Sequence, residues 1–287
     1  MYPYDSDDDG VEDVCGWRAV AAGWDHSCAI DTAYGVECWG DNPTVPTYVP
    51  DDDIVGFRQL NAGQWFVCAI VETEANRQRI FCWGDDVPSG IPESQEFSLV
   101  RAGLDYVCGL GTNGQIKCWA GDKANTVADS SPIGVNFTAM DAGTHHACAL
   151  DEYGSVSCWG SNNNGAVSDA PTDVNHIAIA VGTGHSCVLD ASGGIGCWGA
   201  DSNGQVSDAP KTKGYVALSA GRHFNCVLDA SGGIDCWGHN QTRQVSHAPK
   251  GSGYVDVSAG SDHACALHGS GERVCWGAEA DYVEDAP

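Results

Sequence analysis

Basic residues are scarce in this chain of 287 residues, which has 13 Lys and Arg against 39 Asp and Glu. The formal net charge of −26 at pH 7 repels phosphate backbones, so the composition argues against nucleic-acid binding. A field of this sign favours cations or basic partners, and it also favours the solubility of a surface-exposed protein.

Long hydrophobic runs are missing as well. No apolar run reaches the roughly 18 residues of a membrane span, so we expect no membrane insertion. No segment shows a sustained helical period of 3.6 residues, which disfavours helical repeats. No Ser/His/Asp group or carboxylate pair occurs at a catalytic spacing, so the sequence predicts a non-enzymatic protein.

One pattern recurs instead: a Cys, an aliphatic pair, a Gly-containing turn, and then Cys-Trp-Gly. The clearest copy runs from Cys187 to Gly199. The first cysteines of the seven copies follow one another at 39 or 40 residues and are Cys28, Cys68, Cys108, Cys148, Cys187, Cys226 and Cys265.

Each copy contains four short β-rich runs, as in 215–219, 225–228, 233–237 and 244–246. Four short strands in a unit of about 40 residues are typical of a propeller blade. The sequence therefore predicts an all-β fold: a seven-bladed β-propeller over residues 17–287, preceded by an acidic tail over residues 1–16.

Fourteen of the 15 cysteines form pairs within the copies. The pairs are Cys28 with Cys38, Cys68 with Cys82, Cys108 with Cys118, Cys148 with Cys158, Cys187 with Cys197, Cys226 with Cys236, and Cys265 with Cys275. Opposed positions on antiparallel strands lie within disulfide reach, so we expect one disulfide hairpin per blade. Reduced thiols in a cytosolic protein and zinc sites are the alternatives, although no Cys-x-x-Cys occurs. Disulfides imply an extracellular or cell-surface location.

The consensus Ala-Gly-x-x-His-x-Cys-x-Leu…Gly-x-x-x-Cys-Trp-Gly-x-Asn-x-x-Gly-Gln-Val resembles the repeat of the regulator of chromosome condensation family. That superfamily also contains beta-lactamase inhibitor protein II. The Cys-Trp-Gly variant resembles repeats in secreted bacterial proteins and in crinkly-type plant receptor kinase ectodomains. The resemblance covers residues 17–287 and implies a propeller, but the family hosts exchange factors, inhibitors and receptor ectodomains, so it implies no single function.

The acidic tail contains a candidate metal site. Residues 5–13 fit D-x-D-x-D-G-x-x-D, which resembles the calcium loops of thrombospondin type 3 repeats. The carboxylates of Asp5, Asp7, Asp9 and Asp13 and the carbonyl of Val11 would supply the oxygen ligands that calcium prefers. A disordered acidic tail is the alternative.

Cys15 is the odd cysteine. It can pair between chains, pair with a segment upstream of the given sequence, or remain free. Pairing between chains would allow self-assembly through Cys15 or through the N-terminal tail.

Two sets of aromatic positions recur in the copies. The first stands two residues before each first Cys and comprises His26, Phe66, Tyr106, His146, His185, Phe224 and His263. Because three of the seven are Phe or Tyr, we expect packing or hydrogen bonding inside each blade rather than a ring of metal ligands. The second set is the Trp of each Cys-Trp-Gly, which we expect in the core between blades.

Blades one to three are less regular than the others. Trp24 and Trp65 follow Ala-Gly, where later copies have Thr, Arg or Ser. With Phe66 and Tyr106, they predict that one face of these blades binds a partner, either an unknown protein or a surface glycan.

The sequence thus predicts an extracellular, non-enzymatic protein-binding module. A structural subunit of a cell-surface or filamentous assembly is the alternative, which Cys15 and the acidic tail favour. A guanine nucleotide exchange factor is implied only by the family resemblance, and the cysteine pairs and the acidity count against it.

Overall fold

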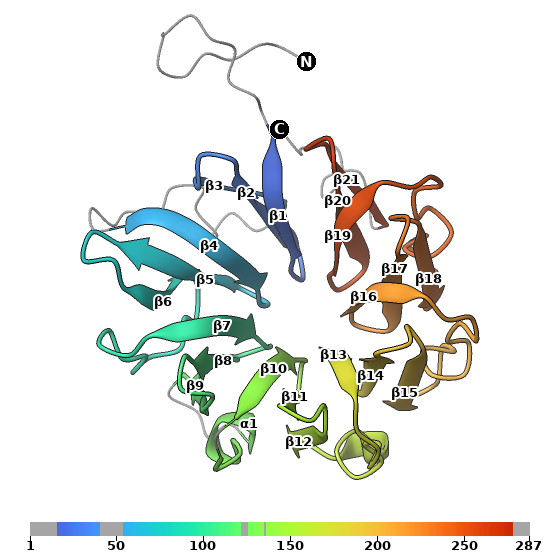
Figure 1. Cartoon of the computed structure of the whole chain (residues 1–287), viewed down its shortest axis with the longest axis horizontal. Helices are drawn as coiled ribbons and strands as arrows, with labels where there is room; N and C mark the ends of the chain where they lie inside the picture. Colours follow the sequence, from blue (N-terminus) through green and yellow to red (C-terminus); the bar gives the residue numbers. More distant parts are fainter. Residues whose placement is uncertain (1–15, 41–53, 122–125, 135, 278–287) are drawn as a thin grey trace, which may run out of the picture.

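Seven three-stranded antiparallel sheets form a ring around a central axis (Figure 1). The computed structural model describes residues 16–40, 54–121, 126–134 and 136–277. Each sheet is one blade and comes from one contiguous repeat, so the predicted seven-bladed propeller is confirmed. Within these ranges, no helix has the length and apolarity needed to cross a membrane.

Every blade has a first, a second and a third strand in chain order. The strands are β1 (Trp17–Ala22), β2 (His26–Asp31) and β3 (Val36–Gly40); β4 (Ile54–Ala62), β5 (Phe66–Thr73) and β6 (Gln78–Gly84); β7 (Phe97–Ala102), β8 (Tyr106–Gly111) and β9 (Ile116–Ala120); β10 (Phe137–Ala142), β11 (His146–Asp151) and β12 (Val156–Gly160); β13 (His176–Val181), β14 (His185–Asp190) and β15 (Ile195–Gly199); β16 (Tyr215–Ala220), β17 (Phe224–Asp229) and β18 (Ile234–Gly238); β19 (Tyr254–Ala259), β20 (His263–His268) and β21 (Arg273–Gly277). Two short helical segments, α1 (Thr126–Asp129) and η1 (Asn163–Gly165), follow blades three and four.

A disulfide joins the second and third strands of every blade. All seven predicted pairs form, with Cα atoms 4.0 or 4.1 Å apart. In blade six, Cys226 lies directly opposite Cys236 in the ladder. The chain can reverse tightly between these strands because Gly232 adopts a φ of +78°, which Gly takes without steric cost.

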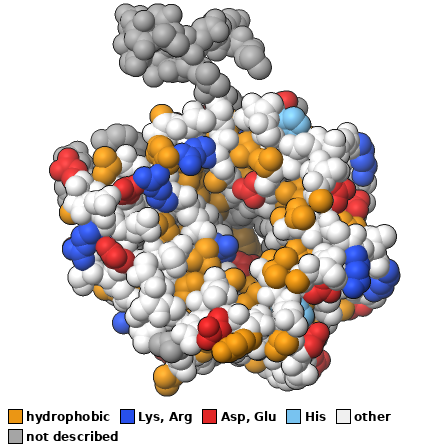
Figure 2. Space-filling view, in the orientation of Figure 1, with side chains coloured by type: hydrophobic (Ala, Val, Ile, Leu, Met, Phe, Trp, Pro, Cys, Tyr) orange, Lys and Arg blue, Asp and Glu red, His pale blue; other side chains and the backbone are white. Residues whose placement is uncertain are grey.

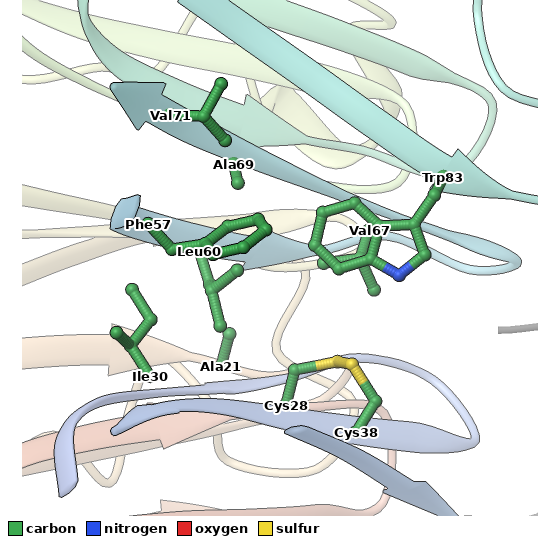
Figure 3. Close-up of a cluster of buried hydrophobic side chains, with 10 residues drawn as sticks. All are labelled: Ala21, Cys28, Ile30, Cys38, Phe57, Leu60, Val67, Ala69, Val71 and Trp83. Carbon is green, nitrogen blue, oxygen red and sulfur yellow. A yellow bond between two sulfur atoms is a disulfide. The ribbon is translucent and has the colours of Figure 1, made fainter. Parts of the chain in front are cut away.

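The tryptophan of each Cys-Trp-Gly packs against the preceding blade. Trp83 of blade two lies beside the Cys28–Cys38 disulfide of blade one in one cluster of buried side chains (Figure 3). Between blades seven and one, Trp39 shares a cluster with Cys265 and Cys275. The seven indoles are only 4% to 7% exposed, so their predicted place in the core between blades is confirmed.

Hydrogen bonds from side chains also join the first strands of adjacent blades. The N–H of Ala102 donates to Asn61 Oδ1 over 2.6 Å, between blades two and three. The N–H of Ala22 donates to Ser258 Oγ over 2.9 Å, between blades seven and one. These bonds satisfy donors on a strand edge that no other strand covers. Ring closure therefore uses the same kind of contact as the other blade boundaries.

The prediction of four strands per blade is wrong, because each of the seven sheets in the described residues has three strands. In blade six, residues 244–246 lie in a series of turns after β18. Asn240 Oδ1 accepts hydrogen bonds from the N–H groups of Val245 and Ser246, both over 3.0 Å. Asn162 and Asp201 accept equivalent bonds in blades four and five. A side-chain acceptor of this kind competes with a β-ladder for the backbone donors, so the short run folds back instead of pairing.

Blade two carries the longer hairpin that its cysteine spacing predicts. Its second and third strands pair as far as Glu72 and Gln78, beyond the length of the other blades. The connection from blade one to blade two contains Pro43, Pro46 and Pro50, and its residues 41–53 lie outside the described residues.

The first residue of each second strand is buried at the boundary with the next blade. The His146 Nε2 lies 2.8 Å from Ser186 Oγ, and the His185 Nε2 lies 3.0 Å from Asn225 Oδ1. The hydroxyl of Tyr106 donates a hydrogen bond to the carbonyl oxygen of Gly143 in blade four over 2.8 Å. The predicted structural role is confirmed, but the hydrogen bonds cross between blades rather than stay inside one.

His26 is the exception among these residues. Both its ring nitrogens are buried without a hydrogen-bond partner among the described residues, and the next blade presents Val67 where Ser186 or Asn225 stands elsewhere. Burial lowers the pKa of His26, and equally of His146, His185 and His263, to about 4.

We predict that replacing Cys226 and Cys236 with Ala lowers the free energy of unfolding by about 2–3 kcal/mol, the loop-entropy value for a ring of this size. The equivalent change of Cys68 and Cys82, which close a loop of 14 rather than 10 residues, should cost only about 0.3 kcal/mol more. Guanidinium denaturation of the oxidised proteins measures both values, and an unchanged midpoint would contradict the prediction.

We predict that His26→Phe preserves or raises stability at neutral pH and weakens the acid dependence of unfolding. The folded-state pKa of about 4 lies below the usual unfolded value of about 6.5, so the unfolded chain binds the proton first. The His26 contribution is complete above pH 6.5 and is lost as the pH falls towards 4, by up to about 3 kcal/mol. Phe66 and Phe224 show that this position accepts Phe.

His185→Phe is the matched contrast, because it removes the hydrogen bond to Asn225 and leaves a buried amide oxygen. Denaturation at pH 7.5, 6, 5 and 4 measures both variants. If His26→Phe and His185→Phe destabilised the protein equally at pH 7.5, the conclusion that His26 lacks the hydrogen bond that His185 makes would be wrong.

Candidate functional site

The ends of the first strands surround a narrow axial channel. Each blade contributes a small pair, Ala-Gly in six blades and Val181-Gly182 in blade five, and the free volume is about 70 Å³. Glycine is required for this close approach, since a Cβ on Gly143 would lie 2.0 Å from the carbonyl oxygen of Gly182. This volume is far below the roughly 300–1,000 Å³ of pockets that bind organic ligands.

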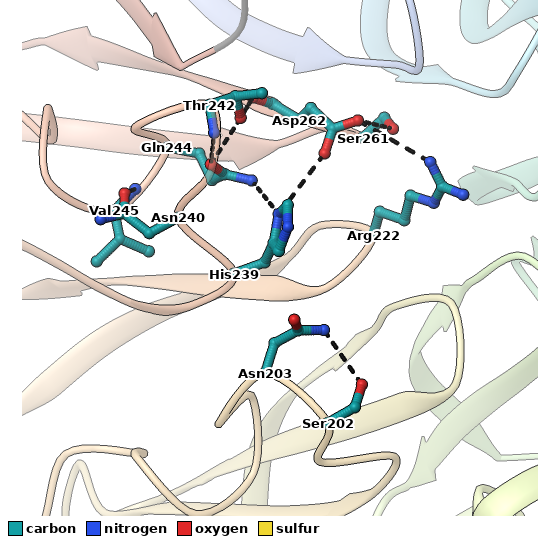
Figure 4. Close-up of polar contacts among 10 residues, drawn as sticks. All are labelled: Ser202, Asn203, Arg222, His239, Asn240, Thr242, Gln244, Val245, Ser261 and Asp262. Carbon is teal, nitrogen blue, oxygen red and sulfur yellow. Dashed lines mark hydrogen bonds and ion pairs between the residues drawn. The ribbon is translucent and has the colours of Figure 1, made fainter.

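A polar cluster lies at the turns of blades six and seven beside this channel (Figure 4). The Gln244 Nε2 donates to His239 Nδ1 over 2.8 Å, and that nitrogen lies 3.9 Å from Asp262 Oδ1. The other Asp262 oxygen lies 4.0 Å from Arg222 Nη1. Within the ranges that the structure describes, no group of three or more His, Cys, Asp or Glu could hold a metal ion. The cluster therefore holds turns together and offers no assembled metal centre.

The four residues predicted to bind a partner separate into two pairs. Trp24 is half-buried beneath the guanidinium of Arg222, whose Cζ lies 5.1 Å from the ring centroid, and Trp65 is 39% exposed. Phe66 and Tyr106 are 1% and 0% exposed. Including these last two in a binding face is a mistake, because their side chains are buried at blade boundaries and cannot reach a partner.

The other predicted sites lie outside the described residues. These are the calcium ligands Asp5, Asp7, Asp9, Val11 and Asp13, and the unpaired Cys15. Calcium binding and assembly through the tail therefore stay predictions.

A second surface emerges from the strand register, which shows a β-bulge at the same position of the first strand in every blade. The bulged residue is exposed in all seven blades. We call these seven residues the bulge ring: Arg18, Arg58, Ser98, Thr138, Ile177, Val216 and Val255. They lie near the hairpin turns between second and third strands, at the opposite end of the strands from the turns that carry Trp24 and Trp65.

The bulge ring is chemically divided around the axis. Ile177, Val216 and Val255 of blades five to seven are apolar and 55% to 62% exposed. Blades one and two present Arg18 and Arg58, and blades three and four present hydroxyl side chains. In Figure 2, Lys and Arg side chains gather on the side of the central opening where β1 and β4 lie, and hydrophobic side chains gather on the side of β16 and β19.

The two arginines of the bulge ring are held in place by Tyr34. Their guanidinium carbons lie 4.1 Å and 4.4 Å from the centroid of its ring, for Arg18 and Arg58 respectively. Hydrogen bonds with Arg18 and Arg58 lower the pKa of the Tyr34 phenol. Arg58 also forms an ion pair with Glu72. Stacking of this kind limits side-chain freedom, so both cations are presented in a restricted geometry.

The bulge ring could not be predicted from the sequence pattern, because a regular β-strand places successive side chains on alternate faces and a bulge breaks this alternation. In the run from Tyr215 to Ser219, alternation places Val216 and Leu218 on one face. The bulge between Tyr215 and Ala217 breaks that period, and Val216 becomes exposed while Leu218 packs against the core. The available signal was the variation of this one position among otherwise similar copies.

Comparison with known proteins agrees with this architecture. The family model of the regulator of chromosome condensation (RCC1) repeat matches residues 137–166, 215–244 and 254–281. Among solved structures, the entire ectodomain of the Physcomitrella patens receptor kinase CR4 is similar with a TM-score of 0.77 and 22% identity, over 92% of this chain and 74% of that chain.

Two further structures show the same likeness. The CRINKLY WD40 ectodomain of the Arabidopsis thaliana receptor kinase ACR4 has a TM-score of 0.72 and 24% identity, over 92% of this chain and 98% of that chain. Prp20p from Saccharomyces cerevisiae has a TM-score of 0.69 and 17% identity, over 85% of this chain and 80% of that chain. With these matches, the repeat pattern and the ring of blades, the chain is a seven-bladed β-propeller of RCC1-like repeats.

Proposed function

We propose that this protein is an extracellular, non-enzymatic module that binds another protein through the bulge ring. The observation that carries the proposal is the exposure of Ile177, Val216 and Val255 on three consecutive blades. Exposed aliphatic side chains grouped on one face favour a protein partner, because burying them on association removes apolar surface from water. The rigid blades hold their positions before binding, which lowers the entropic cost of association.

The arginines add a polar contribution to the same surface. Arg is enriched among the residues that dominate protein interfaces, and Arg18 and Arg58 are already ordered against Tyr34. A carboxylate of the partner near these residues would find its cation in place. The partner that best fits the bulge ring is therefore a protein with an aliphatic patch and a neighbouring acidic group.

The disulfides support the extracellular setting. Seven disulfides persist in an oxidising environment and are rare in the cytosol. The structural neighbours from CR4 and ACR4 are receptor kinase ectodomains, which agrees with this location. Prp20p has been characterised for binding to Gsp1p and histones, so the same fold serves protein recognition in another setting.

Trp24 and Trp65 define a second candidate surface at the other end of the strands. Trp65 is exposed, but Trp24 is already covered in part by Arg222. We therefore place the main contact on the bulge ring and keep the Trp surface as the competing location.

We predict that Ile177→Ser, Val216→Ser and Val255→Ser together reduce partner capture by at least about ten-fold. A ten-fold loss corresponds to about 1.4 kcal/mol, which is less than the full burial of one Val or Ile side chain contributes. The oxidised protein is immobilised and exposed to the extracellular fraction and membrane extract of its source, and captured proteins are identified by mass spectrometry. Val55→Ser is the matched control, since Val55 is 63% exposed but lies on blade two, outside the apolar part of the ring.

A second variant separates the two surfaces. Trp24→Ala with Trp65→Ala should leave capture within about two-fold of the unsubstituted protein if the bulge ring makes the main contact. Loss of capture in this variant, with retention in the triple Ser variant, would move the interface to the Trp surface and overturn the proposal.

A further inference from the structure

A groove of about 360 Å³ lies at the outer rim of blade five. Its floor is formed by β14 and β15, through residues that include Val188, Gly196 and Trp198. Its walls come from the segments that follow blades four and five, residues 169–173 and 210–213. The groove is about five times the free volume of the axial channel and reaches the size range of ligand sites.

Two substitutions within the repeat create this groove. Gly196 has no side chain, whereas the same register position of the other blades carries Glu37, Phe81, Lys117, Ser157, Asp235 and Val274. In blade six, the hydroxyl of Tyr215 donates to Asp235 Oδ2 over 3.0 Å. Blade five has His176 in place of the tyrosine and Gly196 in place of the aspartate. The space that the Tyr–Asp pair occupies in blade six is therefore not filled by such a pair in blade five.

One side of the groove is bordered by an open strand edge. β15 is the last strand of its sheet, and Cys197 lies directly opposite Cys187 with a Cα separation of 4.1 Å. So short a separation is that of a pair that exchanges no backbone hydrogen bonds, so the N–H and C=O of Cys197 point away from β14. An added strand could use this donor and acceptor.

A buried polar side chain lies in the same groove. The His176 side chain is 6% exposed, and its Nε2 lies 3.4 Å from Asp173 Oδ1. Neither ring nitrogen has a hydrogen-bond partner among the described residues. The contact with His176 places the Asp173 carboxylate at the wall of the groove, where it can meet a cationic ligand.

The charges around the groove favour a cation. Asp169, Asp173 and Asp190 line it, against Lys211 and Lys213. Lys213 already donates to Ser192 Oγ over 2.8 Å. The net charge of the whole chain, −26, adds to the attraction for a basic ligand.

We propose that this groove binds an extended basic peptide segment of another protein, which adds to β15 as a fourth strand. The backbone of the peptide pairs with Cys197, a small or flat residue lies over Gly196, and a Lys or Arg side chain points to Asp169 and Asp173. The fourth strand that blade five lacks is thus supplied from outside. The groove is a second binding site, bordered by the outer edge of β15, and its ligand goes beyond the function proposed for the bulge ring.

The test uses the intact oxidised protein and a phage-displayed library of random linear heptapeptides. Peptides are selected on the unsubstituted protein after depletion on the Gly196→Asp variant, and the affinities of synthetic copies are measured by fluorescence polarisation. Gly196→Asp and His176→Tyr each restore a residue that blade six carries, and a Cβ at Gly196 meets Val188 at an ordinary 3.5 Å, so both variants should fold.

We expect the enriched peptides to be basic. They should bind Gly196→Asp and His176→Tyr, the two filled variants, at least about ten-fold more weakly than they bind the unsubstituted protein. Methylating the peptide nitrogen that faces the Cys197 carbonyl should cause a similar loss, because it removes one ladder hydrogen bond. The Val255→Ser variant, changed in the bulge ring of blade seven and not in blade five, should bind the peptide normally, which separates this site from the proposed function. The proposal is overturned if no selected peptide distinguishes the unsubstituted protein from the filled variants, or if the enriched peptides are acidic.

Discussion

The contact between each blade's tryptophan and the disulfide of the preceding blade is the interaction on which the ring depends. Trp83 beside Cys28–Cys38 is one of seven such contacts, and the one that joins Trp39 to Cys265 and Cys275 closes the circle. The disulfide presents a compact apolar surface whose position is set by the hairpin, and the indole buries a large area against it. Blade spacing is therefore determined by the same two residue types at every boundary.

Around this constant framework, the remaining boundary positions vary in matched pairs. Where a second strand begins with His146 or His185, the next blade supplies Ser186 or Asn225 as its partner. Where it begins with Phe66 or Phe224, the next blade has an apolar residue. The mismatch at His26 against Val67 shows that the framework tolerates one unsatisfied boundary.

The sequence predicts the framework well because its signals are local. Cysteines ten residues apart across a Gly-containing turn define a hairpin and its register, so the disulfides and the blade count follow directly. The absence of the fourth strand could not be predicted in the same way. Val245 and Ser246 belong to a β-rich run in the sequence, but their N–H groups donate to Asn240 Oδ1 and not to a neighbouring strand.

The binding surfaces are harder to read because they arise from departures that composition does not mark. A bulge exposes Val216, and a missing side chain at Gly196 opens a groove, yet both residues look ordinary in a single copy. For Phe66 and Tyr106 the prediction was wrong in the other direction. Aromatic residues in irregular blades suggested contact with a partner, although both side chains are buried. Comparing the copies by strand register shows both the exposed position of Val216 and the missing side chain at Gly196.

The pairing of cysteines within single hairpins also bears on how the chain matures. Each of the seven disulfides in the described ranges closes a loop of 10 or 14 residues inside one blade, and none of these seven joins two blades. If the chain is translocated into an oxidising compartment, each of these cysteines would meet its own partner before the next repeat arrives. Oxidation would then proceed one blade at a time, which would limit wrong pairings among the fourteen cysteines.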